Sequence, residues 1–211
     1  MESPRERFSK IYLSEAWGRG EGSGKGSSPE YCSSYMSWLQ ELMRTEKIRS
    51  VLDVGCGDWK YSRHMDWSSL ERYMGVDTVS SILYDGDVEP NIHLGTADVT
   101  IPGSLKLLFA HYTYDLVIMK DILMHLTDEE IAQVVSELVE CPYRLVIVSN
   151  CWRFVRDKSK NGQTRSVDNR YSWAALPFDH PTLLPLGLEV QMYHPRSRKN
   201  QVSLGRGPRK C

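Results

Sequence analysis

Ser50-Val51-Leu52-Asp53-Val54-Gly55-Cys56-Gly57-Asp58-Trp59 is the stretch that decides the fold of this chain of 211 residues. Its apolar run with β-branched members predicts a buried strand. An acid ends the strand, and two glycines at alternate positions permit a sharp turn and a close approach of a ligand to the backbone. A helix is expected to begin near Asp58 and to present free N–H groups at its positive dipole end. The stretch therefore predicts a nucleotide-type cradle at the carboxyl end of the first strand of an open α/β sheet.

The residues after the second glycine narrow the ligand class. A dinucleotide fingerprint requires a third glycine three positions after Gly57, where this chain has Lys60, and a P-loop would require Gly-Lys-Ser or Gly-Lys-Thr. The run Asp53-x-Gly55-x-Gly57 instead resembles motif I of the class I S-adenosylmethionine-dependent methyltransferases, in which the loop receives the amino-acid end of the cofactor. The resemblance implies S-adenosyl-L-methionine as the cofactor. The implied binding set in this loop is Asp53, Gly55, Cys56, Gly57, Asp58 and Trp59.

Acids at two later strand ends extend the resemblance. Asp77 lies twenty residues beyond Gly57, the offset at which an acid reaches the ribose hydroxyls in such folds. The alternative for Asp77 is a solvated acid at a strand end. Asp98 resembles the family position that takes the adenine amino group, with the backbone N–H of Val99 at a ring nitrogen. The implied binding set is completed by Thr78 and Lys120.

Apolar runs and helix caps place the other elements. Strands are expected at residues 71–77, 91–95, 114–119 and 145–148, and a terminal pair at 188–194 and 201–204. Ser28-Pro29-Glu30 predicts the start of one helix, and Thr127-Asp128-Glu129-Glu130 predicts the capping box of another. Terminal hairpins of this kind close the methyltransferase sheet. The resemblance therefore implies an α/β, Rossmann-like fold whose seven-stranded mixed sheet ends in an antiparallel strand and is sandwiched by helices.

The N-terminal segment is rich in glycine, which occupies every second position from Gly18 to Gly26. Its composition predicts a flexible linker, and the alternative is a flap that orders over the cofactor. The resemblance favours the flap, because small methyltransferases with Trp-Gly-x-Gly-x-Gly ahead of motif I have this segment near the cofactor pocket, and it adds Trp17 to the binding set. We expect residues 1–28 to form the flap and 29–211 a single methyltransferase domain, with a substrate-side loop or lid at 150–180.

The net charge, the apolar runs and the cysteines of the whole sequence limit the environment and the partners of the protein. A net charge of −1 provides no general attraction to nucleic acid or to an anionic membrane. No apolar run is long enough to span a bilayer, and the charged start lacks the apolar region of a signal peptide. The five cysteines include no Cys-x-x-Cys pair, which indicates a reducing compartment without a disulfide framework or structural zinc. We therefore expect a soluble, cytoplasmic protein.

The catalytic candidates follow the fourth predicted strand. His125 has the near-neutral pKa that suits a general base, and Asp121 lies four residues earlier, on the same face if this turn is helical. Such an acid could hold the histidine tautomer, and the alternative is a histidine that packs at the sheet edge. Some relatives bind a divalent metal here through Glu-x-x-Glu-His, but this chain lacks one of those ligands, so no metal is expected. Asp168, Tyr171 and His180 are secondary candidates.

The acceptor is suggested by resemblance alone. Gly-Cys-Gly-Asp-Trp and Lys-Asp-x-Leu-x-His-Leu resemble compact methyltransferases found beside glycosyltransferases in bacteria and large algal viruses. That resemblance implies O-methylation of a sugar, a glycan or another small polar acceptor, and a glycosyltransferase domain as a partner. The Pro-Pro motif of nucleic-acid amino methyltransferases is absent after the fourth strand. A protein or RNA methyltransferase and a catalytically silent cofactor-binding module are the alternatives.

Overall fold

A computed structural model describes residues 2–18, 20, 22–151, 181–193 and 200–207. Two compact units, residues 1–98 and 99–211, are each described by themselves. The secondary catalytic candidates Asp168, Tyr171 and His180, and most of the predicted lid at 150–180, lie outside the described residues. No helix in the described part of the chain combines the length and the apolar character needed to cross a membrane.

The first unit contains a parallel sheet in the order β3-β2-β1. Its strands are β1 (Ser50–Val54), β2 (Arg72–Asp77) and β3 (Ile92–Thr96), within a residue or two of the predicted bounds. Asp53 pairs with Gly75, and Asp77 pairs with Thr96. Because the strands are parallel, their carboxyl ends meet at one edge, and this edge carries the glycine loop and Asp77.

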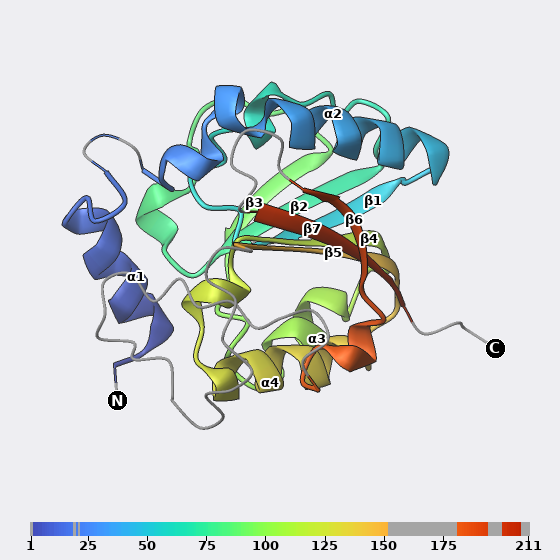
Figure 1. Ribbon diagram of the computed structural model, residues 1–211. Helices are drawn as coiled ribbons and strands as arrows, with labels where there is room; N and C mark the ends of the chain where they lie inside the picture. Colours follow the sequence, from blue (N-terminus) through green and yellow to red (C-terminus); the bar gives the residue numbers. More distant parts are fainter. Residues whose placement is uncertain (1, 19, 21, 152–180, 194–199, 208–211) are drawn as a thin grey trace. The chain divides into compact units, whose positions relative to one another are not determined.

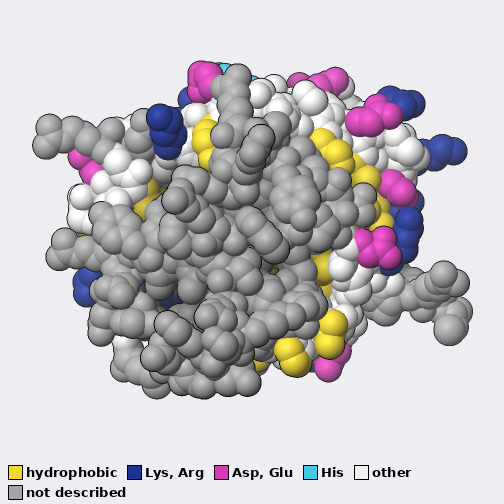
Figure 2. Space-filling view, in the orientation of Figure 1, with side chains coloured by type: hydrophobic (Ala, Val, Ile, Leu, Met, Phe, Trp, Pro, Cys, Tyr) yellow, Lys and Arg dark blue, Asp and Glu magenta, His cyan; other side chains and the backbone are white. Residues whose placement is uncertain are grey.

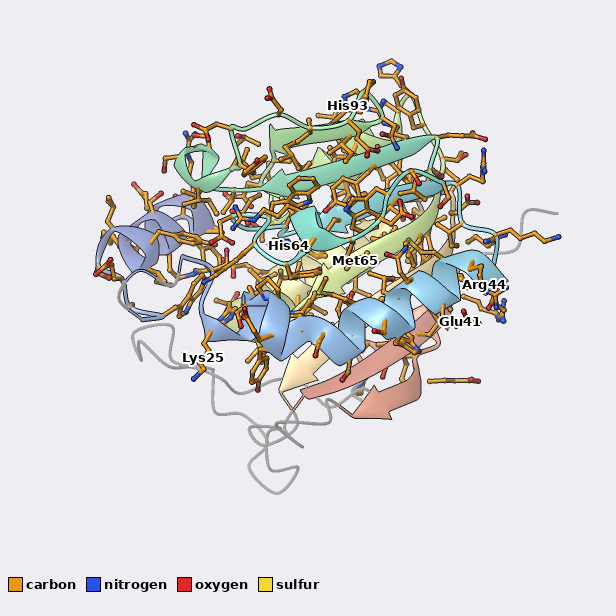
Figure 3. The ribbon with its side chains drawn as sticks, turned by 90° about the horizontal axis from the view of Figure 1, so that it is seen from above. Lys25, Glu41, Arg44, His64, Met65 and His93 are labelled. Atoms are coloured by element: carbon orange, nitrogen blue, oxygen red, sulfur yellow. The ribbon has the colours of Figure 1, made fainter. Side chains whose placement is uncertain are left out.

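Helix α2 (Pro29–Thr45) lies along one side of this sheet (Figure 1). The Ser28 side chain accepts the Tyr31 N–H at 3.3 Å, which confirms the predicted cap. Its buried residues are Cys32, Tyr35, Leu39 and Met43, and the last three recur every four residues, so they lie on one face of the helix. Glu41 and Arg44 form an exposed ion pair on the helix (Figure 3).

Two features of the first unit differ from the prediction. Helix α1 (Pro4–Leu13) precedes the glycine-rich segment, and its capping box of Ser3 and Glu6 is the signal that the sequence analysis missed. The helix expected near Asp58 does not form. A turn leads instead to a three-residue 3₁₀ helix, η2 (Ser62–His64). Trp59 has a φ of 55°, in the left-handed region, so the backbone cannot continue as an α-helix there.

The second unit contains a mixed sheet. Strands β4 (Tyr114–Lys120) and β5 (Tyr143–Cys151) are parallel, β7 (Asn200–Arg206) is antiparallel to β5, and β6 (Glu189–Tyr193) is antiparallel to β7. Residues 116–119 of β4 are fully buried, as the near-continuous apolar run predicts. The predicted terminal hairpin is confirmed in β6 and β7, and residues 194–199 of its connection lie outside the described part.

Two α-helices belong to the second unit. Helix α4 (Asp128–Leu138) begins with the predicted capping box of Thr127 and Glu130. Helix α3 (Ser104–Phe109) was not predicted, and the buried Glu137 of α4 caps it by accepting the N–H groups of Gly103 and Lys106 at 3.1 and 2.8 Å. Short 3₁₀ helices complete the described elements of the chain: η1 (Lys25–Ser27), η3 (Ser80–Ile82), η4 (Leu123–His125) and η6 (Leu184–Leu186).

Candidate functional site

The backbone N–H groups of the glycine loop, residues 55–60, all donate to acceptors within the first unit. Gly55 and Gly57 have φ values of 73° and 60°, a left-handed conformation that favours glycine. The Gly55 and Cys56 N–H groups donate to the Val76 carbonyl, and the Gly57 N–H donates to the Asp77 carboxylate. The N–H groups of Asp58, Trp59 and Lys60 donate to the Ser23 hydroxyl, the Cys56 carbonyl and the Asp58 carboxylate, respectively. The sequence predicts free N–H groups at the start of a helix here. The structure has instead a loop whose N–H groups already donate to acceptors within the protein.

Asp77 lies beside this loop, as its spacing predicts. One carboxylate oxygen accepts the Gly57 N–H and the other accepts the Val79 N–H, each at 3.0 Å. Burial raises the pKa of Asp77, and hydrogen bonds from the backbones of Val79, Gly57 and Thr78 oppose that rise. Because each carboxylate oxygen can accept two hydrogen bonds, Asp77 can hold the loop and still accept from the hydroxyls of a ligand.

A buried chain of hydrogen bonds holds the loop from within the core. The Trp59 indole N–H donates to the Tyr73 hydroxyl at 3.0 Å, and this hydroxyl donates to an Asp53 oxygen at 2.6 Å. All three residues are buried, and the Trp59 and Tyr73 rings lie 5.9 Å apart. These bonds show that Asp53 and Trp59 position the loop, and their predicted contact with the cofactor stays a prediction. Sequence reasoning missed Tyr73, which reads as an ordinary strand residue.

The other predicted loop and strand-end residues, apart from Val99, lie at the same edge of the first unit. The Ala97 N–H donates to the Asp77 carbonyl at 3.0 Å, which brings the segment carrying the half-buried Asp98 to the end of β2. The Thr78 hydroxyl oxygen is buried and has no hydrogen-bond partner among the described residues. Cys56 is buried, and burial raises the pKa of its thiol well above the ordinary value. Val99 is buried too, and it begins the second unit.

The N-terminal segment contacts the glycine loop through Ser23. The Ser23 hydroxyl accepts the Asp58 N–H at 2.9 Å, and the Ser23 N–H donates to the Asp58 carboxylate at 3.2 Å. The Tyr12 hydroxyl of α1 lies 3.1 Å from the Ser23 hydroxyl. Trp17 packs edge-on against Tyr12, with ring centroids 5.1 Å apart, so it lies within the segment that covers the loop. These contacts place the segment against the glycine loop, and its role as a flap stays a prediction.

The second unit brings together a cluster at the carboxyl ends of β4 and β5. The Lys120 ammonium donates to one Asp121 oxygen at 2.8 Å, and the Ser149 hydroxyl donates to the other. The Asp121 N–H donates back to Ser149 at 3.2 Å, and Asp121 has a left-handed φ of 59°. Burial raises the pKa of Asp121, but the charge and hydrogen bond of Lys120 and the bond from Ser149 outweigh it, so the pKa is lowered.

His125 ends the 3₁₀ turn η4, and its charge also contributes to the lowered pKa of Asp121. The two side chains are therefore within electrostatic reach. They are not related by an α-helical i, i+4 spacing, because left-handed Asp121 precedes a single 3₁₀ turn. Lys120 was predicted as a cofactor contact; its ammonium donates to Asp121, and the cofactor contact stays a prediction. Within the described residues no His, Cys, Asp or Glu side chains form a group of three or more that could hold a metal ion.

Comparisons with known proteins identify the fold. No family model matches the chain, and no curated protein matches it. Among solved structures, magnesium protoporphyrin IX methyltransferase (ChlM) from Synechocystis PCC 6803 with bound SAM aligns with a TM-score of 0.63 at 15% identity, over 99% of each chain. The methyltransferase domain of bacterial CtHen1 aligns with a TM-score of 0.60 at 16% identity, over 83% of this chain and 99% of that one. N-methyltransferase NodS from Bradyrhizobium japonicum WM9 aligns at 0.57 and 12% identity, over 85% and 98%. The chain therefore has the class I methyltransferase fold, an α/β Rossmann-like architecture with a mixed sheet.

Proposed function

We propose that this chain is an S-adenosylmethionine-dependent methyltransferase that methylates a hydroxyl of a sugar or of another small polar acceptor. The observation that carries the first part is the contact between the Gly57 N–H and the Asp77 carboxylate, at the carboxyl ends of β1 and β2. This edge is where open α/β folds bind their ligands. The fold shared with ChlM, CtHen1 and NodS supports the same reading.

The residues present fit an adenosyl ligand better than a phosphate. Phosphate sites at strand-to-helix turns use free backbone N–H groups and the positive end of a helix. Here the N–H groups of residues 55–60 already have acceptors, and only a three-residue 3₁₀ helix follows. A nicotinamide dinucleotide or a nucleoside triphosphate is therefore disfavoured. Asp77 can accept from ribose hydroxyls, and Asp98 is the candidate acceptor for the adenine amino group.

The cofactor, when bound, supplies an electrophilic methyl group on a positively charged sulfur. A neutral hydroxyl is a weak nucleophile, so the chain must supply a base. Asp121 is a poor base near neutral pH, because its lowered pKa keeps it ionised and its oxygens are engaged by Lys120 and Ser149. We assign proton removal to His125, with Asp121 as a fixed anion that favours the charge the imidazole acquires.

The sugar acceptor is supported by resemblance to the small methyltransferases associated with glycosyltransferases, and such an enzyme domain is the proposed partner. Figure 2 shows Lys or Arg side chains and Asp or Glu side chains together on the described rim of one face. A cytoplasmic location is part of the same proposal.

Calorimetry and methyl transfer test the proposal in two steps. Wild-type protein titrated with S-adenosylhomocysteine and separately with NAD should bind the first and not the second. Incubation with labelled S-adenosylmethionine and a panel of sugars and glycosides should then transfer label. Binding of NAD alone would refute the cofactor, and transfer to RNA or protein but not to any sugar would refute the acceptor. Binding without transfer to any acceptor class would favour a silent module.

Deletion of residues 208–211 separates the alternative acceptors further. Gly207 is kept because its N–H donates to the Arg144 carbonyl at 2.8 Å. The deletion removes two basic residues, Arg209 and Lys210. An enzyme that uses them to hold RNA or protein should lose activity, whereas a sugar enzyme should retain it.

A further inference from the structure

We propose that the hydroxyl pair of Tyr12 and Ser23 binds the carboxylate at the amino-acid end of the cofactor, with the Tyr12 hydroxyl donating to the carboxylate and the Ser23 hydroxyl donating to Tyr12. Both residues belong to the first unit, and neither lies in the glycine motif. The inference rests on the proposed function and deepens it, because it assigns a role to the N-terminal segment. It also makes the amino-acid end a determinant of which adenosyl compounds bind.

The glycine loop cannot supply the donors that a carboxylate needs. A carboxylate removed from water requires hydrogen-bond donors in return. Each N–H group of residues 55–60 already has an acceptor, and most of these acceptors belong to the loop or to β2. The exception is the Asp58 N–H, whose acceptor is Ser23 of the N-terminal segment. Within the described part of the first unit, the segment that contacts the loop through Ser23 can supply such donors.

A count of protons shows that the hydroxyl pair has one to spare. The two oxygens lie 3.1 Å apart and share one hydrogen bond, which uses one of their two protons. The Ser23 oxygen receives a further bond from the Asp58 N–H, which uses no hydroxyl proton. Neither hydroxyl makes any other hydrogen bond in the described residues, so one O–H can donate to a ligand in either arrangement of the pair.

The pair stands over the loop surface that the ligand would approach. A Cβ placed on Gly57 would lie 2.2 Å from the Ser23 oxygen and 3.5 Å from the Tyr12 oxygen, so Gly57 is needed to admit these hydroxyls. Burial and the Asp77 charge raise the pKa of Tyr12, which keeps its hydroxyl protonated and able to donate. The same Asp77 is the candidate ribose acceptor. The adenosyl and amino-acid ends of one ligand would thus meet adjacent parts of one unit.

Binding of two ligands that differ in the amino-acid end tests the inference. Y12F and S23A are titrated calorimetrically with S-adenosylhomocysteine and with methylthioadenosine, which lacks the amino-acid end. Loss of a hydrogen bond to a charged group corresponds to roughly a tenfold to hundredfold loss of affinity, so we expect about tenfold or more for S-adenosylhomocysteine in Y12F, and a smaller loss in S23A, which removes only the support of the Tyr12 hydroxyl. Affinity for methylthioadenosine should stay within about twofold, on the same reasoning. Y112F and S33A are matched controls, since Tyr112 is 47% exposed and the Ser33 hydroxyl donates to the Glu30 carbonyl of its own helix.

Three outcomes would overturn the inference. Unchanged affinity for S-adenosylhomocysteine in both variants would remove the hydroxyls from the ligand site. Equal losses for both ligands would show that Tyr12 and Ser23 only support the loop. Failure of the wild-type protein to bind S-adenosylhomocysteine would refute the proposed function, and this inference with it. Thermal unfolding of each variant verifies that the titrated protein is folded. If S23A does not fold, the affinities of Y12F alone decide the test.

Discussion

Replacement of Asp77 by alanine should weaken both the folded protein and its binding of S-adenosylhomocysteine. The carboxylate accepts one N–H from the glycine loop and one from Val79, two residues after the end of β2. Alanine removes both acceptors and leaves two largely buried donors without partners. It also removes the proposed acceptor for the ribose hydroxyls. Stability and affinity should therefore fall together.

The magnitude follows from the number of donors left unpaired. Each buried N–H without an acceptor costs about 1–3 kcal/mol, so two cost roughly 2–6 kcal/mol. The substitution also removes a carboxylate whose ionised form is penalised by burial, as the raised pKa of Asp77 indicates, and this offsets part of the loss. We expect a net loss of about 2–3 kcal/mol for D77A. D77N should lose roughly half as much, because its amide oxygen can replace one of the two acceptors.

Urea unfolding at pH 7 measures the stability loss, and calorimetry measures the affinity loss. D87A is the control, because Asp87 is an exposed acid of the same unit. The pH dependence provides an independent measurement. Because the folded-state pKa of Asp77 is raised, the native state binds the proton more tightly than the unfolded state does. The wild-type protein should therefore lose stability relative to D77N as pH rises from about 4 through the raised pKa. An alanine variant with wild-type unfolding and wild-type affinity would refute the reasoning.

Three further substitutions test the other contacts. Y73F should destabilise the protein by about 3 kcal/mol, because it deprives a buried carboxylate and a buried indole N–H of their shared partner; a wild-type urea midpoint would contradict this. S149A should raise the pKa of Asp121. In the wild-type protein this pKa is lower in the folded state than in the unfolded state, so the ionised Asp121 stabilises the fold at neutral pH, and that stabilisation is lost as the pH falls through the pKa of the folded state. Acid unfolding of S149A, followed by circular dichroism, should therefore begin at higher pH, and coincidence with wild type would count against the contact. H125A should lower kcat far more than it changes affinity for S-adenosylhomocysteine, and an unchanged rate from pH 6 to 9 would leave His125 as a packing residue.

Features that depend on neighbouring residues could be predicted from the sequence. The strands of the first unit follow apolar runs, and the caps of α2 and α4 follow from Ser28 and Thr127. The position of Asp77 was also predictable. Parallel strands end at the same edge, so an acid that ends β2 must lie near a loop that leaves β1.

Features set by distant contacts could not be predicted in the same way. The residues after Gly57 suggested a helix, but Trp59 is left-handed and its indole bonds Tyr73, fourteen residues further along the chain. Ser23 is one of several serines in a glycine-rich segment, and only folding shows that its hydroxyl meets the Asp58 N–H. Tertiary contacts decided the loop, and local propensity did not.

The catalytic cluster shows how such a contact changes a chemical assignment. Sequence spacing paired Asp121 with His125 alone, whereas the register of β4 and β5 places Lys120 opposite Ser149. Both residues bond the Asp121 carboxylate, and together they hold its pKa low. A carboxylate stabilised in this way resists protonation, so it cannot accept a proton efficiently from a hydroxyl near neutral pH. In the proposed reaction the proton therefore goes to another group, and the His125 imidazole, within electrostatic reach of this anion, is the candidate.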